Sequence, residues 1–427
     1  MLQVRALSPE PIAKIDTRNV SFPLHHVNPI VIDRSNHTVS RRMISPKALT
    51  VLNRLHEAGF IAYLAGGGVR DLLLGRQPKD FDIATSAHPN QVKRLFSNCR
   101  LVGRRFRLAH VMFRDGYIEV ATFRARLPDE ERAVPEHLFQ KRDGLIARDN
   151  VFGTPPEDAV RRDFTVNALF YNISDRSIID YVGGLKDLDQ RLLRVIGDPV
   201  TRFTEDPVRM IRAIRFAAAL DFTIEESAWQ AIVQLKDSIA LASRERLYEE
   251  WMKLLFCRRA EAAIGKLVSA GLFDVLFPQM GAWLKTPAGA EGQKWFAKAL
   301  RQIDAWIKAG MVPGDSLLWA LLFGAYHEWS AERLMKDGCP PRKALGDSVF
   351  AHLMEPGNGV RIPKWIAIGS SQIVAAQPSF ERTKGKRAER FANHRLFSDA
   401  LVYFKFSSSL TGRNKDLLNE WMAMRSR

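Results

Sequence analysis

The alternation of apolar and polar residues becomes regular near residue 45. Ser45 is a candidate helix cap, Pro46 suits the first helical position, and leucines then recur on one face. Residues 61–64 are a short apolar run that predicts a buried strand, and the glycines after it predict a turn into a second helix ending at Gly75. The preceding residues show no sustained period, so we expect residues 1–44 to form a flexible N-terminal extension.

Further segments have the two-residue period of β-strands. Residues 80–83 alternate between polar and apolar side chains, which predicts a strand with one polar face. Residues 110–113 and 117–123 flank an Asp-Gly pair, which is typical of a β-hairpin. The stretch from residue 127 to residue 153 is charged and aperiodic, so we expect a flexible loop there.

Helical periodicity replaces the strand signals after residue 184. Residues 207–220, 225–235 and 244–256 have helical patterns separated by short connections, and several similar segments follow. This switch of pattern predicts an α+β fold in which a mixed α/β head precedes an all-helical region. We therefore divide the chain after its extension into a head, a neck and a body: residues 45–185, 186–260 and 261–427.

Charge adds a candidate partner to this picture. The 427 residues carry a formal net charge of +16, which favours a polyanion such as nucleic acid or an acidic membrane surface, with simple solubility as the alternative. Three scattered cysteines indicate a reducing compartment and argue against disulfides and a zinc site. No apolar run approaches the ~20 residues of a membrane span, and no signal-peptide core is seen. We expect a cytoplasmic protein.

The candidate chemistry lies between the second predicted helix and the strand that follows it. Alternation places Asp80 and Asp82 on one face of that strand, with Phe81 turned to the core. Two carboxylates on a rigid strand suit Mg²⁺ and two-metal nucleotidyl transfer. The glycine turn at residues 66–68 offers backbone N–H groups to a triphosphate, and Arg70 can add a charged contact. Each feature alone is more often a solvated pair or a plain turn, and only their order and spacing make the signal.

Residues 64–71, followed by Asp80-Phe81-Asp82, resemble the head motif of the class II nucleotidyltransferases. That family, within the polymerase-β superfamily, holds bacterial poly(A) polymerases and CCA-adding enzymes. The resemblance implies a polymerase-β-like head with a small mixed sheet, followed by an all-helical neck and body. It also implies that Asp80 and Asp82 bind catalytic Mg²⁺. Glu119 fits the third carboxylate expected on a neighbouring strand, with an exposed strand residue as the alternative.

Two further motifs resemble the same family. Residues 161–169 match its second motif, in which the arginine and the aspartate, here Asp163, lie against the nucleotide's ribose and phosphates. Asp163 can also cap a helix. Residues 205–209 match the motif whose aspartate and arginine, here Asp206 and Arg209, select the base; a plain ion pair on a helix surface is the alternative.

The resemblance thus assigns roles residue by residue. Catalytic roles fall on Asp80, Asp82, Glu119 and Asp163. Nucleotide binding falls on Gly66, Gly67, Gly68, Arg70, Arg162, Asn167, Asp206, Arg209 and Arg212. Basic residues expected to contact the RNA backbone, unless they only form a solvated face, are Arg104, Arg105, Lys384, Lys386 and Arg387.

The reaction implied is template-independent addition of adenylate from ATP to RNA 3′ ends. Residues 101–111 resemble the signature that separates poly(A) polymerases from CCA-adding enzymes, and Val111-Met112 departs from the glycine–threonine element of the latter. RNA-decay machinery is a further candidate partner. Two alternatives stay open: a CCA-adding or A-adding tRNA nucleotidyltransferase, and a non-catalytic RNA-binding protein on the same fold.

Overall fold

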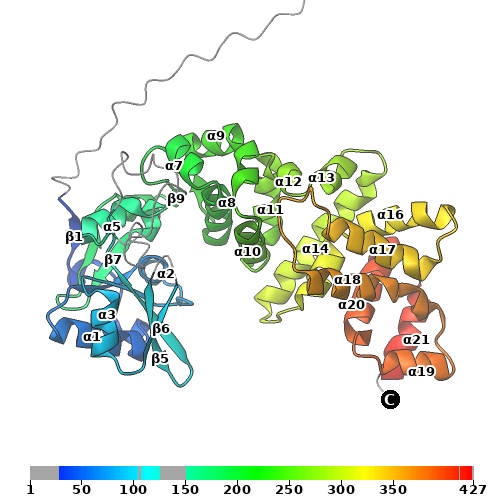
Figure 1. The fold of residues 1–427 in the computed structure, drawn as a ribbon, viewed down its shortest axis with the longest axis horizontal. Helices are drawn as coiled ribbons and strands as arrows, with labels where there is room; N and C mark the ends of the chain where they lie inside the picture. Colours follow the sequence, from blue (N-terminus) through cyan, green and yellow to red (C-terminus); the bar gives the residue numbers. More distant parts are fainter. Residues whose placement is uncertain (1–27, 104–106, 126–150, 413, 426–427) are drawn as a thin grey trace, which may run out of the picture.

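The computed structural model describes residues 28–103, 107–125, 151–412 and 414–425. The chain runs in order through a head, a neck and a body, and the head and body stand at opposite ends of the molecule (Figure 1). The head holds the large sheet and everything beyond it is almost entirely helical, which confirms the α+β prediction. Most of the loop expected at residues 127–153, together with Arg104 and Arg105, lies outside the described residues.

The head is built on one mixed sheet of eight strands in the order β1-β8-β7-β2-β3-β6-β5-β4. Within it β3 and β6 are parallel, whereas the other neighbouring strands are antiparallel. The hairpin expected around an Asp-Gly pair is the β5–β6 hairpin. The strands are β1 (Ile30–Ile32), β2 (Ala62–Ala65), β3 (Asp82–Thr85), β4 (Cys99–Val102), β5 (Leu108–Phe113), β6 (Gly116–Thr122), β7 (Leu169–Asn172) and β8 (Ile178–Asp180).

Part of the expected N-terminal extension belongs to the head. Strand β1 pairs with β8 at the edge of the sheet, and Val39 and Ile44 are buried in the core. Sequence periodicity missed this segment because one three-residue strand and two single-turn 3₁₀ helices are too short to show a period. The described residues 28–44 are therefore not a separate flexible arm.

The helices of the head pack against the sheet. The helix predicted after Ser45 is α1 (Pro46–Glu57), which buries Val51, Leu52 and Leu55. A glycine turn joins β2 to α2 (Gly67–Leu73), as expected. Strand β3 begins only at Asp82, so the strand is shorter than expected and Asp80 precedes it. The remaining head helices are α3 (Pro89–Leu95), α5 (Pro155–Arg161), η5 (Thr165–Asn167) and α6 (Gly184–Asp189).

The neck contains the three helices that the periodicity predicted, now α8, α9 and α10. A short parallel pair, β9 (Leu192–Leu193) with β10 (Thr223–Ile224), was not expected. Two-residue strands leave no periodic signal in sequence. The neck helices are α7 (Pro199–Glu205), α8 (Val208–Leu220), α9 (Glu226–Gln234), η6 (Lys236–Leu241) and α10 (Arg244–Leu255).

The body continues the neck's hydrophobic core. Trp251 of α10 packs against Phe277 and Trp319, and Phe323 extends this aromatic cluster. Within the described ranges, no helix is both long and apolar enough to cross a membrane. The body helices are α11 (Ala260–Ser269), α12 (Leu272–Leu276), α13 (Pro278–Leu284), α14 (Gly289–Lys308), α15 (Asp315–Leu322), α16 (Gly324–Lys336), α17 (Pro341–Leu353), α18 (Lys364–Ala375), η7 (Gln377–Glu381), α19 (Lys386–Ala392), α20 (Phe397–Thr411) and α21 (Lys415–Arg425).

Two histidines form a buried pair inside the body. The Nε2 of His327 and the Nδ1 of His352 are 3.0 Å apart, and both side chains are buried. Burial lowers the pKa of His352 to about 3. Burial, together with His352, also holds the pKa of His327 well below its ordinary value. Both rings are therefore neutral in the folded body, where one of them donates to the other.

We expect acid to destabilise the folded chain through this pair. An unfolded histidine binds a proton below about pH 6.5, whereas the buried rings do not. Each buried histidine therefore lowers the free energy of unfolding by about 1.4 kcal/mol for every pH unit below that value. The thermal midpoint, followed by circular dichroism, should fall as the pH drops below 6.5. The double variant His327→Gln/His352→Gln should be less stable at neutral pH but depend less on pH. Equal slopes in both proteins would contradict this account.

Candidate active site

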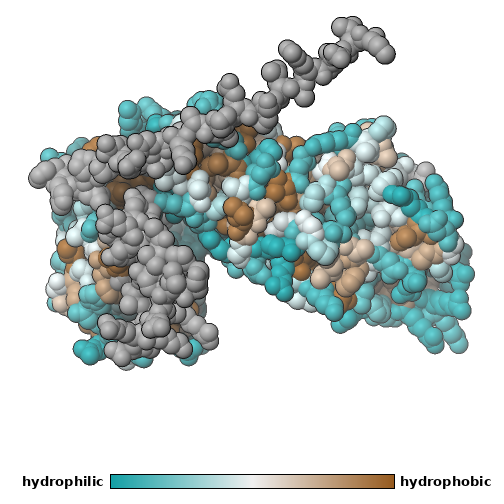
Figure 2. Space-filling view, turned by 45° about the horizontal axis from the view of Figure 1, so that its top comes forward, coloured by the Kyte–Doolittle hydropathy of each residue, from teal (hydrophilic) through white to brown (hydrophobic). Residues whose placement is uncertain are grey.

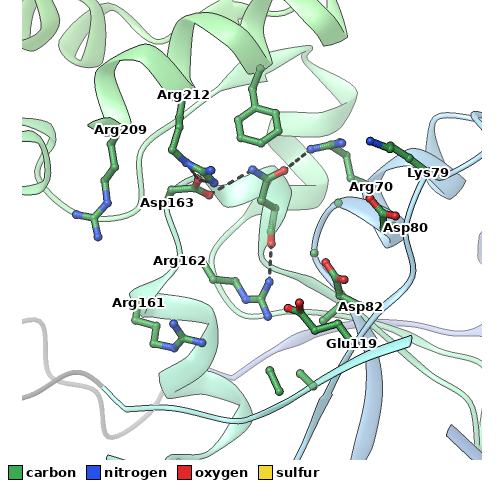
Figure 3. A pocket seen from close by; sticks show the side chains of 18 of the residues that line it. Arg70, Lys79, Asp80, Asp82, Glu119, Arg161, Arg162, Asp163, Arg209 and Arg212 are labelled. Atoms are coloured by element: carbon green, nitrogen blue, oxygen red, sulfur yellow. Dashed lines mark hydrogen bonds and ion pairs between the residues drawn. The ribbon is translucent and has the colours of Figure 1, made fainter. Parts of the chain in front are cut away.

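A polar cavity of about 740 Å³ lies between the head and the neck. The carboxylates of Asp80, Asp82 and Glu119 line its head side, whereas Arg209 and Arg212 reach it from α8 (Figure 3). Charged residues of both signs dominate the lining. Those that sequence analysis had not assigned are Asp71, Lys79, Arg124, Arg161, Arg215, Arg246, Glu249 and Glu250.

The carboxylate cluster follows from strand register. Ile83 pairs with Val120 in the parallel β3–β6 ladder, so Asp82 and Glu119 are side by side one residue earlier. This confirms that Glu119 stands on a strand next to Asp82. Asp80 and Asp82 are exposed while Phe81 between them is buried. The common orientation expected for the two aspartates thus holds although Asp80 precedes the strand.

Asp82 is held in an unfavourable electrostatic position. Although Asp82 as a residue is exposed, its carboxylate is partly desolvated within the cavity. This desolvation, and then the neighbouring Glu119 and Asp80, raise its pKa to about 6, whereas Arg162 acts in the opposite direction. Three carboxylates this close repel one another, and a bound cation relieves that repulsion. The cluster is therefore an electrostatic fit for a divalent metal.

A cross-strand contact orients the third carboxylate. Glu119 is registered opposite His110 in the β5–β6 hairpin, and the His110 Nε2 and Glu119 Oε2 atoms are 3.4 Å apart. The His110 ring is stacked on Tyr117, with 4.2 Å between ring centroids. These contacts limit the positions open to Glu119, whose side chain is about one-third exposed (34%).

The turn at Gly66 and Gly68 is packed so closely that a side chain at either position would crowd a neighbouring group. Gly66 has a φ of 73°, and a Cβ at this position would approach Arg162 to 2.9 Å. A Cβ on Gly68 would be 3.3 Å from the carbonyl oxygen of Asp80. The Gly66 N–H is used by Leu169, so Gly67 and Gly68 hold the amides at the start of α2 that can face a ligand.

Arg70 lines the cavity beside the glycine turn, as expected. Its Nε and Nη2 donate to Asp71 at 2.9 and 2.7 Å, and its Nη1 donates to the side chain of Asn167. The side chain is only 8% exposed. These contacts fix the position of the guanidinium in the cavity wall, and its role in binding phosphate stays a prediction.

Asp163 is the anchor between head and neck. Its Oδ1 accepts from the Phe164 amide at 2.8 Å and from Asn167 at 3.3 Å, and its Oδ2 accepts from Nε of Arg212 at 3.0 Å. Burial raises the pKa of Asp163, but Arg212 and the other donors outweigh burial and leave the pKa below its ordinary value. Asp163 thus positions Asn167 and Arg212 at the cavity, and its catalytic role stays a prediction.

Arg162 is fixed by a buried carboxylate of α5. Asp158 accepts from Arg162 Nη2 at 2.8 Å and from Arg161 Nη2 at 2.5 Å, and Asp158 itself is buried. Arg162 Nη1 also donates to the carbonyl oxygen of Asn167 at 3.2 Å. Asp158 thus forms ion pairs with two adjacent arginines and fixes the position of both guanidinium groups at the cavity.

Asp206 and Arg209, the two residues expected to select the base, are each held by a different partner. Asp206 ends α7 and its carboxylate contacts Arg246 of α10 at 2.8 Å. Arg209, in the first turn of α8, donates to Glu205 at 3.2 Å and to the carbonyl oxygen of Arg202 at 2.8 Å. The alternative of a mutual Asp206–Arg209 ion pair is therefore wrong. Both side chains line the cavity, each held by a separate partner.

Phe216 and Glu250 organise the arginines at the base of α8. The guanidinium groups of Arg70, Arg212 and Arg215 lie 5.4, 5.4 and 4.1 Å from the centroid of the Phe216 ring. Glu250, which is buried, accepts from Arg215 at 2.9 Å. The sequence alone does not show the arginine partners of Glu250, because they come from a different helix.

The basic run expected to contact RNA stands apart from the cavity. Lys384, Lys386 and Arg387 are exposed around the start of α19, at the far end of the body (Figure 1). None of the three lines the cavity. An RNA held by both regions would have to run along the body.

The carboxylates of the cavity suit a metal site that is shared with a substrate. In the described part of the chain, no three carboxylate, histidine or cysteine side chains are grouped closely enough to hold an ion alone. Mg²⁺ is commonly held by one or two carboxylates together with substrate phosphates. The raised pKa of Asp82 and the oxygen-only donors fit such a shared site.

Three family models match the chain in order. Residues 62–194 match the "Poly A polymerase head domain", and residues 221–284 match the "Probable RNA and SrmB- binding site of polymerase A". Residues 337–426 match the "Polymerase A arginine-rich C-terminus".

Individual relatives agree with the family models. Poly(A) polymerase I of Salmonella typhi is 39% identical over 397 residues, which cover 92% of this chain and 85% of that protein. A CCA-adding enzyme of Bacillus velezensis is 34% identical over 291 residues, covering 64% of this chain and 70% of its own. The solved CCA-adding enzyme of Bacillus stearothermophilus in complex with CTP superposes with a TM-score of 0.59 at 28% identity, covering 89% of this chain and 82% of its own.

The fold and the cavity define a nucleotidyltransferase with a polymerase-β-like head and a helical neck and body. Within this class, poly(A) polymerase relatives match more of the chain, at higher identity, than the CCA-adding enzyme does. The chain belongs to the bacterial poly(A) polymerase I family.

Because the ionised form of Asp82 is disfavoured in the fold, we predict that this carboxylate lowers the stability of the metal-free protein. In metal-free protein above neutral pH, Asp82→Asn should raise the thermal midpoint by about 2 °C or more, because it removes a charge that burial and two carboxylates disfavour. The gain should shrink below about pH 6, where the wild-type carboxyl is protonated.

Two controls sharpen this measurement. Asp115→Asn changes an exposed aspartate of the same head, whose pKa is lowered mainly by a hydrogen bond to Lys47, and should not stabilise. Added Mg²⁺ should stabilise the wild type more than Asp82→Asn. A destabilised Asp82→Asn protein would show that Asp82 has a structural role instead.

Proposed function

We propose that this chain adds adenylate from ATP to RNA 3′ ends without a template and releases pyrophosphate. The observation that supports it most is the cavity, where carboxylates of the head face arginines of the neck across a space of nucleotide size. Family membership supports the reaction type, since poly(A) polymerase I relatives match over most of the chain.

The phosphates of ATP lie between the glycine turn and the cations of the cavity. The amides of Gly67 and Gly68 donate to phosphate oxygens, and the turn leaves room because neither position carries a Cβ. Lys79 and Arg162 border the same space and neutralise charge. Arg162 is already fixed by Asp158, so it requires little reorganisation when the nucleotide binds.

The carboxylates place the reacting groups. Mg²⁺ held by Asp80 and Asp82 would neutralise the triphosphate and lower the pKa of the RNA 3′-hydroxyl. That hydroxyl forms the new bond to the α-phosphorus, and the bond to the pyrophosphate leaving group breaks in line with it. Glu119 adds negative charge beside Asp82, and no covalent enzyme intermediate is needed.

Asp206 and Arg209 read the base. They approach the cavity from the end of α7 and the start of α8, with one acceptor and one donor group. Glu205 and Arg246 hold the two side chains at separate places, so their spacing stays fixed when no nucleotide is present. Such an arrangement can present a hydrogen-bonding edge to a base in place of a template strand.

RNA leaves the cavity along the helical body. A net charge of +16 and the exposed Lys384, Lys386 and Arg387 suit contacts with its backbone. The domain limits that follow are a head at 45–185, a neck at 186–260 and a body at 261–427, with the described residues 28–44 joined to the head.

The first test offers the purified chain Mg²⁺ with ATP, CTP or both. Two acceptors are compared: an unstructured RNA and a tRNA that lacks its CCA end. We expect long tails made only of A on the unstructured RNA. Addition confined to tRNA and ending after C-C-A or a single nucleotide would replace this proposal by tRNA repair with the same carboxylates.

The carboxylate assignment has its own test. Asp80→Ala and Asp82→Ala should each lower kcat by at least about a hundredfold while RNA affinity, measured by fluorescence anisotropy, stays within twofold of the wild type. Asp115→Ala, on the exposed hairpin turn, should keep full activity. Substantial Mg²⁺-dependent transfer by either cavity variant would refute the assignment.

Base selection predicts a different pattern. Arg209→Ala should reduce the preference for ATP over CTP, measured as the ratio of kcat/KM values, by about tenfold, because the donor to the base edge is lost. Its control is Arg301→Ala, which removes an exposed arginine of the body that pairs with Glu261. An unchanged ratio with a uniformly lower rate would assign Arg209 to structure alone.

A further inference from the structure

The body carries an exposed aromatic residue that the proposed site does not use. Trp365, the second residue of α18, is 63% exposed, and Ile368 one turn later is 41% exposed. Lys364 and Gln372 complete this outward surface, which we name the α18 face. Among the described residues, no other aromatic ring or cation is paired with the Trp365 indole. An exposed aromatic ring beside a second apolar side chain and a cation is a candidate surface for stacking a base.

The opposite side of the same helix explains why Trp365 is not part of the core. Ile366, Ala367 and Ser370 are buried against neighbouring helices, and Ser370 donates to the carbonyl oxygen of Ser316 at 2.8 Å. The inward side of α18 is therefore already satisfied. Substituting an outward residue such as Trp365 leaves this packing intact.

Positive charge borders the α18 face. Lys364 precedes the indole directly and is exposed. Arg361, just before the helix, has a side chain that is 71% exposed. Arg361 forms an ion pair with Glu245 of α10 at 2.8 Å, and in the described structure no other acid pairs with Arg361 or Lys364. The apolar part is small and flanked by cations. On the face of the molecule seen in Figure 2, hydrophilic residues are mixed with hydrophobic patches.

The α18 face is connected to the active-site cavity through α10. The Arg361 N–H donates to the carbonyl oxygen of Arg244 at 3.1 Å. Two residues along α10, Arg246 pairs with Asp206 in the cavity lining. Residues 361–365 can span at most about 14 Å, so Trp365 is within a few nucleotides of the cavity rim.

The other end of α18 leads to the basic run of the body. After α18 the chain passes through η7 to Lys384, Lys386 and Arg387. In Figure 1, α18 lies between α10 of the neck and α19 of the distal body. The α18 face therefore stands between the cavity and the exposed cations already expected to contact RNA.

We propose that the α18 face is a stacking platform for the growing RNA strand. Trp365 stacks on an unpaired base a few nucleotides upstream of the 3′ end, Ile368 packs beside that base, and Lys364 and Arg361 contact the adjoining phosphates. Single-stranded RNA is held in this way by aromatic rings set among cations, without demanding one particular base. This inference rests on the proposed function, since it requires an RNA 3′ end in the cavity.

The observations favour RNA over a docked protein. A stable protein interface needs a broad apolar centre, whereas the α18 face offers two apolar side chains flanked by positive charge. Its place between the cavity and a basic run also matches a path for a strand that emerges from the site. A docked protein remains as an outcome of the test.

The first experiment measures RNA binding by the full chain with fluorescence anisotropy. Labelled oligoadenylate long enough to extend from the cavity past α18 is compared with the dinucleotide ApA, which is too short. Trp365→Ala should weaken binding of the long RNA at least about fivefold, and Trp365→Phe should restore most of it. Leu241→Ala, which truncates an apolar side chain that is 84% exposed at the end of η6, should bind as the wild type does.

The second experiment asks whether a base is the contact. A long RNA with abasic upstream positions should bind the wild type and Trp365→Ala equally, because there is no base left to stack. In tailing assays, Trp365→Ala should raise the KM for long RNA, with kcat, the KM for ATP and the use of ApA unchanged. Equal affinity of wild type and Trp365→Ala for the normal long RNA would overturn the platform and leave a protein partner as the reason for the exposed indole.

The two levels of the proposal fail separately. A wild-type chain that adds nucleotides to no RNA would contradict the proposed function, whatever Trp365 does. A wild type that makes A-tails while Trp365→Ala keeps normal RNA affinity would contradict only the platform.

Discussion

One continuous chain of charged hydrogen bonds joins the head to the neck across the active-site cavity. It runs from Arg70 through Asn167 and Asp163 to Arg212, and Glu250 continues it into α10. Arg70, Asn167 and Glu250 are buried, and the Arg212 side chain is 31% exposed. An unpaired partner among the buried members is costly, which makes the arrangement specific. Because Asp80, Asp82 and Glu119 belong to the head and Asp206 and Arg209 to the neck, these contacts set the distance between the two sides of the cavity.

Two aspartates of the cavity, Asp82 and Asp163, show opposite electrostatic balances. The raised pKa of Asp82 shows that burial and its carboxylate neighbours disfavour its ionised form. Asp163 shows the opposite balance, since its donors outweigh burial. Asp82 is thus left to be satisfied by a ligand, whereas Asp163 is satisfied by the protein. Perturbation that the fold does not relieve is typical of functional groups.

The helical body supports the site as well as the RNA path. On α10, Trp251 packs into the aromatic core with Phe277 and Trp319, while the adjacent Glu250 faces the arginines of α8. Packing in the body therefore fixes a charged group at the cavity. The same α10 meets the start of α18 through Arg244 and Arg361, so one helix touches the cavity, the body core and the proposed platform.

The sequence by itself determined the local features: the helix that starts at Pro46, the glycine turn, the paired aspartates and the hairpin that carries Glu119. These depend on residues close along the chain, where periodicity and turn chemistry act directly. Only the tertiary structure decided that Arg70 bonds to Asn167, that Asp206 faces Arg246, and that β1 joins the sheet. Partners at least 40 residues apart along the chain are chosen by how whole elements pack, and no local pattern of side chains encodes that choice.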